Sequence, residues 1–372
     1  MKLSQTVFAV LLYHSFAWAL PSIEVVQSVP METKLLVPGI RQTQEVWLEM
    51  IQGAKSKIDL EQFYVSDEAG QALAPVLSAI REAASRGVKV RFLVDTKFFA
   101  TYPDPISQLG HVSGIQVKKV DFASYGGVQH AKYFIVDGRN AFVGSQNFDW
   151  RALSHIHEIG LRVDDLLVGA DLEMIFEKDW AMGSLFVEES NLLRMPGVTT
   201  VVASPTKANP SGISDTLSEV LKLIGEAKEV LKLQVMEYST HIYGSIERWK
   251  ILDDALRAAA AKGVRVQLLV DVSDLKKAKD DLLGLAQVKN IEVKTVTIPQ
   301  WSGGAIPFAR LIHSKYLVAD HVSSWVGSEN WSQGYFMNTR NVGLLVSRPE
   351  ISAQLEQVFD TVWLSEYSLK LQ

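Results

Sequence analysis

The chain has 372 residues, of which 47% are hydrophobic and 21% charged, so it is long and apolar enough to fold as two domains with full cores. Its formal net charge of −5 excludes a general electrostatic attraction to nucleic acid or anionic membranes. An anionic ligand must therefore be bound by local positive charge. The chain has no cysteine, which excludes disulfides, thiol chemistry and cysteine-based zinc sites.

Residues 1–19 have the pattern of an export signal. Lys2 precedes a mostly apolar segment at 7–16, and the Ala-Trp-Ala at 17–19 is a small-x-small cleavage site. The apolar segment is shorter than the roughly 20 residues that cross a bilayer, so we expect a cleaved signal peptide and no permanent membrane anchor. The sole glycosylation-type triplet, at 330–332, lies inside a motif that the chain carries twice. We therefore expect an exported, periplasmic or secreted protein, with a bacterial origin favoured.

Two segments, residues 81–95 and 257–271, share 9 of 15 positions and indicate an internal duplication. Each begins in an amphipathic helix that ends at a glycine suited to a left-handed cap, Gly87 or Gly263. An alternating strand follows in each half and ends at Asp95 or Asp271. These two aspartates either face a ligand at the strand ends or cap the turn after the strand, and we favour the cap.

Strands that alternate with amphipathic helices predict central sheets covered on both faces. The expected fold is therefore α/β, with two duplicated α/β/α sandwich domains related by a pseudo-twofold axis. The first domain is expected at 20–194 and the second at 214–372. Between them, residues 195–213 contain several prolines and glycines and are expected to form the linker.

One pattern, H-x-K-x4-D-x6-G-S-x-N, occurs once in each half with identical spacing. The first copy consists of His130, Lys132, Asp137, Gly144, Ser145 and Asn147, and the second of His313, Lys315, Asp320, Gly327, Ser328 and Asn330. Two six-residue matches at the same spacing exclude a chance resemblance. The pattern supplies, in duplicate, an imidazole, an ammonium and an amide.

These groups suit the cleavage of a phosphodiester. A neutral imidazole can attack phosphorus to form a phosphohistidine, and a protonated imidazole can donate to the leaving oxygen. The lysines neutralise the phosphate oxygens without a metal or other cofactor, and the asparagines supply amide donors. The serines either contact the phosphate or close the turn after glycine. The candidate catalytic residues are thus His130, His313, Lys132, Lys315, Asn147 and Asn330.

The two halves differ at one position that bears on the histidines. Glu158 follows His130 at the same distance at which Asn341 follows His313. We expect Glu158 to hold the Nδ1–H of His130 and raise its basicity, with Asn341 orienting His313. This hypothesis adds Glu158 to the catalytic residues and makes His130 the nucleophile and His313 the acid/base. The pattern His155-x-His157-Glu158 suggests either a metal site or alternation along one strand, and we favour the strand.

At these motifs the chain resembles the phospholipase D superfamily. Within it, further segments resemble the branch of animal lysosomal 5′ exonucleases and the related poxvirus envelope phospholipase-like proteins, over most of residues 45–365. Those segments are residues 147–151, 235–238, 306–308 and 330–332, the last together with residues 335–336. The resemblance implies a sandwich of two α/β/α domains, a metal-independent phosphohistidine mechanism and the active-site set named above. It also implies that Asp137 and Asp320 are structural.

Three functions remain open from the sequence. The favoured one is an exported phosphodiesterase that cleaves single-stranded nucleic acid from an end. Aromatic residues near the motifs either stack on bases or belong to the core; they are Phe148, Trp150, Trp301, Trp331 and Tyr335. The alternative is phospholipid head-group hydrolysis or transfer, with the loop 301–308 as an apolar lip. An inactive binding protein is the third, and the intact duplicate motifs argue against it.

Overall fold

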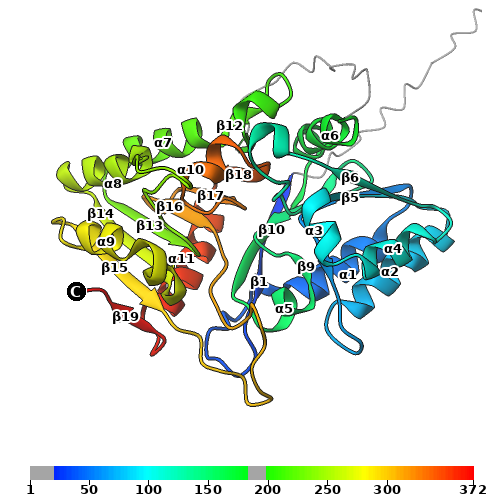
Figure 1. Ribbon diagram of the computed structural model, residues 1–372, viewed down its shortest axis with the longest axis horizontal. Helices are drawn as coiled ribbons and strands as arrows, with labels where there is room; N and C mark the ends of the chain where they lie inside the picture. The colour runs from blue at the N-terminus through cyan, green and yellow to red at the C-terminus, as the bar shows by residue number, and fades with distance from the viewer. Residues whose placement is uncertain (1–20, 183–197) are drawn as a thin grey trace, which may run out of the picture.

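The computed structural model describes residues 21–182 and 198–372, so the expected signal peptide at 1–19 lies outside the described residues. The two halves of the chain lie side by side, each with a mixed sheet flanked by helices (Figure 1). The predicted α/β class and the duplication are therefore confirmed. In the part of the chain that the structure describes, no helix is both long and apolar enough to cross a bilayer.

The sheet of the first half has eight strands in the order β2-β1-β10-β8-β7-β3-β5-β6. Its strands are β1 (Ser22–Ser28), β2 (Arg41–Gln42), β3 (Lys57–Gln62), β5 (Lys89–Asp95), β6 (Ile115–Val120), β7 (Tyr133–Val136), β8 (Asn140–Gly144) and β10 (Glu158–Asp164). A separate pair joins β4 (Val65–Ser66) to β9 (Phe148–Asp149). The helices are α1 (Thr43–Gly53), α2 (Ala74–Ser85), α3 (Thr96–Thr101), α4 (Asp104–Gly110), α5 (Trp150–Ser154) and α6 (Leu166–Trp180), with a 3₁₀ turn η1 (Ala123–Tyr125).

The sheet of the second half has nine strands in the order β12-β11-β18-β17-β16-β13-β14-β15-β19. Its strands are β11 (Thr199–Ser204), β12 (Ser214–Asp215), β13 (Val230–Val235), β14 (Arg265–Asp271), β15 (Ile291–Val296), β16 (Tyr316–Ala319), β17 (Ser323–Gly327), β18 (Asn341–Ser347) and β19 (Ser368–Lys370). The helices are α7 (Thr216–Glu226), α8 (Ile251–Ala261), α9 (Leu275–Ala286), α10 (Gln333–Met337) and α11 (Pro349–Trp363), with 3₁₀ turns η2 (Thr206–Ala208) and η3 (Val272–Asp274). Apart from β19, its strand order repeats that of the first sheet.

The predicted helix, glycine and strand recur in both halves. Gly87 follows α2 at φ +91° and Gly263 follows α8 at φ +98°, the left-handed conformation that glycine adopts without strain. The strands β5 and β14 then end at Asp95 and Asp271. Asp95 accepts hydrogen bonds from the backbone N–H groups of the next turn, at 2.9 and 3.0 Å, and Asp271 accepts one at 2.9 Å. The expected capping role of both aspartates is confirmed.

Part of the expected linker at 195–213 belongs to the second sheet. Residues 199–204 form β11, which pairs antiparallel with β18 from Thr199↔Val346 to Ser204↔Asn341. The prolines and glycines that suggested a linker lie on both sides of this strand in the sequence, at 196–197 and 205–212, whereas residues 201–204 of the strand itself are buried. The second sheet therefore begins at residue 199, and the expected start of its domain at 214 is corrected.

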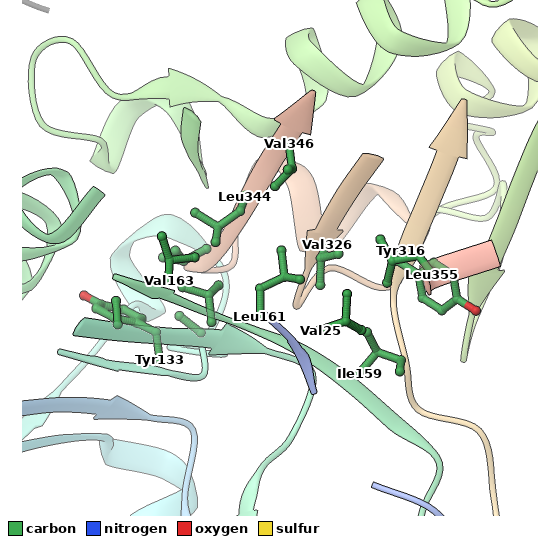
Figure 2. Close-up of a cluster of buried hydrophobic side chains, with 14 of the residues drawn as sticks. Val25, Tyr133, Ile159, Leu161, Val163, Tyr316, Val326, Leu344, Val346 and Leu355 are labelled. Atoms are coloured by element: carbon green, nitrogen blue, oxygen red, sulfur yellow. The ribbon is translucent and has the colours of Figure 1, made fainter. Parts of the chain in front are cut away.

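One hydrophobic core lies between the two sheets and contains residues of both halves (Figure 2). Strands β1 and β10 contribute Val25 and Leu161, and β16 and β18 contribute Tyr316 and Leu344. The inner helices α6 and α11 complete it, whereas two outer cores lie under α1 and α2 and under α7, α8 and α9. Because the central core is shared, the two halves are fixed relative to each other.

A buried ion pair also joins the halves. Arg340 is 0% exposed and binds Asp179 of α6 through two hydrogen bonds of 2.7 and 2.9 Å. Its other N–H groups donate to the carbonyl oxygens of Ser204 and Ala208 and to the Asn209 side chain. The guanidinium is therefore well hydrogen-bonded, as a buried charge requires.

The motif aspartates Asp137 and Asp320 tie the end of one strand to the start of another. Asp137 adopts φ +53° and accepts from the backbone N–H groups of residues 55–57 at 2.7–3.0 Å. Asp320 adopts φ +51° and accepts from residues 228–230 at 2.8–3.0 Å. Both side chains therefore hold the backbone at the start of β3 and β13.

Replacing Asp137 by alanine removes the acceptor of these N–H groups, and we expect the free energy of unfolding to fall by about 1–2 kcal/mol. Denaturant unfolding measures this loss, with Asp320→Ala as the matched variant from the other half. The folded fraction should keep the wild-type kcat. A large loss of kcat at an unchanged unfolding midpoint would show that the aspartate acts in the reaction.

Candidate active site

The two His-x-Lys segments meet where the halves join. His130 and Lys132 precede β7, and His313 and Lys315 precede β16, the equivalent strand of the other sheet. All four side chains are largely buried, with His130 5% and His313 9% exposed. Charge on each lysine lowers the pKa of the histidine of the other half, which places the four groups in one site.

Each histidine ring is held by a side chain from the opposite half. His130 Nδ1 lies 2.9 Å from Asn341 Oδ1, and His313 Nδ1 lies 3.0 Å from both carboxylate oxygens of Glu158. The prediction that Glu158 holds His130 was therefore wrong. Glu158 and Asn341 are the first residues of β10 and β18, and each strand begins against the motif of the other half rather than against its own.

The backbone makes the same crossed contacts. The N–H of His130 donates to the Arg340 carbonyl at 2.8 Å, and the N–H of His313 donates to the His157 carbonyl at 2.9 Å. His157 and Arg340 occupy equivalent positions, directly before Glu158 and Asn341. Each histidine is thus fixed at its backbone and at its ring by two successive residues of the other half.

The motif serines hold the partners of the histidines. Ser145 Oγ donates to Glu158 at 2.5 Å, and Ser328 Oγ donates to Asn341 Oδ1 at 3.0 Å. Both serines are fully buried. The sequence left open whether these serines contact the phosphate or close the turn after glycine, and these contacts correspond to neither role. Each serine instead orients the carboxylate or amide that holds the histidine of the opposite half.

Asp95 and Asp271 also position the motifs, a role beyond capping that the sequence analysis did not include. The second carboxylate oxygen of Asp95 accepts from the N–H of Gln129 at 2.8 Å, and that of Asp271 accepts from the N–H of Ile312 at 3.0 Å. Gln129 and Ile312 directly precede the two histidines. The sequence signal for this role is that both aspartates end parallel strands at the edge of the sheet where the motifs lie.

Burial and mutual repulsion make the two lysines responsive to an anion. Burial, reinforced by Lys315, holds the pKa of Lys132 well below its usual range. Burial likewise lowers the pKa of Lys315 to about 7, partly opposed by Glu158. Each ammonium also donates to the carbonyl of its own motif histidine. An anion bound between the lysines would raise both pKa values, because it stabilises the charged form.

The pKa values of the two histidines are lowered, whereas the pKa of Glu158 is raised. Burial lowers the pKa of His130 and of His313 well below the usual range, and the two lysines add to the effect. Burial raises the pKa of Glu158 to about 8, opposed by Lys315 and the Ser145 hydrogen bond. Burial therefore favours the uncharged forms of both members of the Glu158–His313 pair. An anion close to His313 favours its protonated form.

The two motif asparagines lie near the ends of β8 and β17 and are largely buried. Among the described residues, Asn147 Oδ1 and Asn330 Oδ1 have no hydrogen-bond partner. Asn330 donates to the hydroxyl of Tyr335, whose ring lies 5.1 Å from the His130 ring. Asn330 of the second half is therefore placed on the His130 side of the site.

The pattern His155-x-His157-Glu158 forms neither a metal site nor an alternating strand, because its side chains reach three different places. His155 ends α5 and packs between the rings of Trp150 and Trp301. His157 Nδ1 lies 3.1 Å from Ser314 Oγ, and only Glu158 belongs to β10. Within residues 21–182 and 198–372, no group of three or more His, Asp or Glu side chains is placed to hold a metal ion.

Most of the five aromatic residues for which stacking on bases and a place in the core were both left open belong to the core. Phe148, Trp150 and Trp331 are buried, and Trp301 packs against His155, which leaves Tyr335 beside the site. Phe63 was not predicted at the site, but its ring lies 4.8 Å from the His130 ring and 4.9 Å from Lys132 Nζ. The sequence feature that could have indicated Phe63 is its position directly after β3, at the edge of the sheet where the two motifs lie.

The pairing of β3 and β13 shows which of their residues are equivalent. Glu61 of β3 pairs with Tyr133, and Gln234 of β13 pairs with Tyr316, so Glu61 and Gln234 are equivalent and Glu237 is not. Glu61 accepts from the Tyr133 hydroxyl at 2.6 Å and from Gln129 at 3.1 Å. Glu61 thus supports the residue that precedes His130.

Comparison with known proteins gives the family. The model described as "Cardiolipin synthase, PLD-like domain" matches residues 47–180 and again 220–363. The chain is 28% identical to mouse "5'-3' exonuclease PLD4" over 93% of this chain and 79% of that protein. It is 31% identical to bovine "5'-3' exonuclease PLD3" over 88% of this chain and 75% of that protein. It is 29% identical to Dictyostelium discoideum "Phospholipase D Z" over 93% of this chain and 90% of that protein.

Solved structures share the fold at low sequence identity. Phosphatidylserine synthase from Haemophilus influenzae Rd KW20 superposes with a TM-score of 0.66 and 12% identity, over 88% of this chain and 85% of that one. Polyphosphate kinase from Porphyromonas gingivalis superposes with a TM-score of 0.63 and 14% identity, over 94% of this chain and 48% of that one. With both halves matched by the PLD-like model and the paired motifs brought into one site, the chain belongs to the phospholipase D superfamily and is a phosphodiesterase, either a nuclease or a phospholipase.

Proposed function

We propose that the protein is an exported hydrolase that cleaves single-stranded nucleic acid from its 5′ end through a covalent phosphohistidine. The observation that carries this proposal is the crossed pairing of the histidines. One ring is held by an amide and the other by a carboxylate, with two buried lysines beside them. This arrangement provides one neutral imidazole and one that can be protonated, which are the two forms that a two-step displacement needs.

The partners assign the roles. The Nδ1–H of His130 donates to the amide oxygen of Asn341, so its Nε2 lone pair is free while the ring stays neutral. His130 is therefore the nucleophile. The carboxylate of Glu158 stabilises a protonated His313, which makes His313 the general acid. The roles expected from the sequence are retained, but their physical reason is reversed, because the carboxylate supports the acid rather than the nucleophile.

In the first step, His130 Nε2 forms a bond to phosphorus as the bond to the leaving oxygen breaks. The leaving oxygen keeps that electron pair and takes a proton from His313. In the second step, His313, now neutral, removes a proton from water while the oxygen of that water attacks phosphorus. The phosphorus–nitrogen bond breaks, its electron pair returns to His130, and the free phosphate ester leaves.

The other motif residues stabilise charge on the phosphate. Lys132 and Lys315 face the site from opposite halves and neutralise the non-bridging oxygens. Asn147 and Asn330 supply amide donors to the same oxygens. Two lysines in a largely buried site act at low dielectric, where their attraction for an anion is much stronger than in water.

Two observations favour nucleic acid as the substrate. Relatives named as 5′–3′ exonucleases align with most of the chain, and flat aromatic rings flank His130 on two sides, Phe63 and Tyr335. Phospholipid is the second candidate, because relatives named as phospholipases D align equally well and Phe308 is 78% exposed on the loop 301–308. Export is proposed from residues 1–19 alone.

Incubation with 5′-hydroxyl single-stranded DNA and, separately, with phosphatidylcholine vesicles tests the substrate. We expect nucleotide release without choline release, and loss of at least about 10³-fold in rate for His130→Asn, which removes the nucleophile. Phe308→Ala should leave nucleotide release unchanged. Choline release without nucleotide release would reject the nuclease, and activity that survives His130→Asn would reject the mechanism.

Rapid quenching during turnover tests which histidine is phosphorylated. We expect the phosphoryl group on His130, and a larger fraction of phosphoenzyme in His313→Asn with an activated leaving group, because that variant lacks the base for the second step. Mass spectrometry of the digested protein locates the modification. A phosphoryl group on His313 of the wild-type protein would reverse the assignment.

The pH profile tests the Glu158–His313 pair. Below about pH 7 Lys315 and the pair both hold their protons, so kcat/KM should fall as the pH rises through about 7 to 8 and these protons are lost. Glu158→Gln should lower kcat by about 10²–10⁴-fold and move this fall to lower pH, because His313 alone must then retain the proton.

Asp274→Asn is the matched control for the pH profile. Asp274 is also buried, and burial raises its pKa to about 7, but it accepts from the backbone N–H of Tyr238 rather than from a histidine. We expect its profile to keep the wild-type shape at high pH. An identical profile for Glu158→Gln and the wild-type protein would show that Glu158 does not control the proton of His313.

A further inference from the structure

Four aromatic rings run in sequence from His130 to a pocket on the first half of the molecule; we name them the aromatic row. The row consists of Phe63, Phe98, Tyr64 and Tyr102. Phe63 lies 4.8 Å from the His130 ring and 3.9 Å from Phe98. Phe98 lies 6.1 Å from Tyr64, and Tyr64 lies 4.8 Å from Tyr102, with interplanar angles of 22° and 24°.

The row shares an anchor with the catalytic histidine. Asp95 caps α3, which carries Phe98 and is followed directly by Tyr102, and the same carboxylate holds the backbone N–H that precedes His130. Tyr64 is fixed separately, since its hydroxyl donates to Asp149 at 2.9 Å. The position of the rings relative to the reacting imidazole is therefore set by the fold.

The rings at the outer end of the row are accessible. No residue of α3 is buried, and Phe98, Tyr64 and Tyr102 are all partly exposed. They stand in contrast to Phe148 and Trp331, which are enclosed by the core. Partly exposed, nearly parallel rings offer faces and edges on which another flat ring can stack.

Tyr102 also lines a pocket of about 440 Å³ at the end of the row. Polar or charged residues line one part of this pocket, among them Ser66, Asp67, Arg81, Asp104 and Gln108, and apolar residues line the rest: Val65, Ala69, Leu77, Pro103 and Pro105. The polar groups can pair with the hydrogen-bonding edge of a nucleobase, whereas an acyl chain would leave them unpaired.

Positive charge accompanies the row, although the chain as a whole is acidic. Lys97 is exposed and directly precedes Phe98, and Lys119 Nζ lies 4.5 Å from the ring of the neighbouring Phe99. Arg81 adds a further cation at the pocket. Aromatic rings interspersed with cations are the combination that binds bases by stacking and the backbone by charge.

We propose that the aromatic row and its pocket form a subsite for the bases of a single-stranded nucleic acid whose phosphodiester is held at His130. This inference rests on the proposed function and adds where the strand lies: it leaves the reacting phosphate along α3 on the first half. Phe98 is the central contact, because it lies on α3, where no residue is buried, and contacts both Phe63 and Tyr64, whose rings also lie 5.3 Å from each other.

The test combines Phe98→Ala with oligonucleotides that carry one abasic residue at successive positions. With the wild-type protein, an abasic residue at the position that stacks on the row should raise KM roughly 10-fold, the effect expected for one lost stacking contact. Phe98→Ala should raise KM on the intact oligonucleotide by the same factor and make KM insensitive to that abasic position. Phe98→Trp should restore the wild-type KM.

Tyr243→Ala is the matched control, because Tyr243 is a fully exposed aromatic residue of the second half, and its KM should equal that of the wild-type protein. If the wild-type protein releases no nucleotide, the proposed nuclease function fails and the subsite with it. If the wild-type protein is a nuclease but Phe98→Ala keeps the wild-type KM and abasic pattern, the nuclease stands and the subsite is rejected.

Discussion

The structure depends on hydrogen bonds that cross from each half of the chain to the histidine of the other. Each imidazole is held at Nδ1 by the first residue of the opposite strand, and its backbone N–H by the residue before it. These hydrogen bonds keep their length only if the two sheets do not shift relative to each other. Their length matters because catalysis is sensitive to displacements of about 1 Å. The shared core and the buried Arg340–Asp179 pair provide that rigidity.

The two buried lysines between the halves destabilise the site electrostatically, and an anionic ligand reduces this destabilisation. Lys132 and Lys315 repel each other in a medium that solvates neither, and burial alone already disfavours their charged forms. Glu158 and Glu329 offset part of this repulsion. A phosphodiester anion offsets more, so binding and charging of the lysines are coupled. This coupling explains how a protein of net charge −5 can bind a polyanion locally.

Much of the fold was predictable because each sequence pattern occurs in both halves of the duplicated chain. The helix, the left-handed glycine and the strand that ends in aspartate recur in both halves, and so do the six motif residues. The partners of the histidines were not predictable in the same way. Equal spacing shows that Glu158 and Asn341 are equivalent, but equivalence does not tell which half each strand faces. The assignment of Glu158 to His130 assumed contact within one half, and the contact crosses between them.

Tertiary packing also decides the other features that the sequence left open, missed or misassigned. Phe148 and Trp331 follow the motif asparagines and yet point into the cores. Phe63 and Phe98 are remote from the motif in sequence but lie at the same edge of the sheet as His130. Likewise, His155 is spaced like a strand residue with respect to His157, but a hydrogen bond from its N–H to Arg151 makes it the end of α5.

The residues at equivalent positions around the two histidines differ in charge. Behind His130 lie Arg340, Asp179 and Glu61, whereas the matching positions behind His313 are occupied by His157, Val362 and Gln234. Burial lowers the pKa of His157 to about 4, so this second group is neutral at physiological pH. His130, whose ring is held by the amide of Asn341, thus has charged groups behind it. His313, whose ring is held by the carboxylate of Glu158, has neutral groups behind it.

The crossed contacts also explain why a single fused chain is chemically useful. If two copies of the first half paired in the same geometry, both rings would face a glutamate, and two copies of the second half would give two rings that both face an asparagine. A symmetric pair of that kind has no means of telling its attacking ring from its protonating ring. Covalent linkage of two unlike copies removes this degeneracy, so that each ring keeps one task throughout the catalytic cycle.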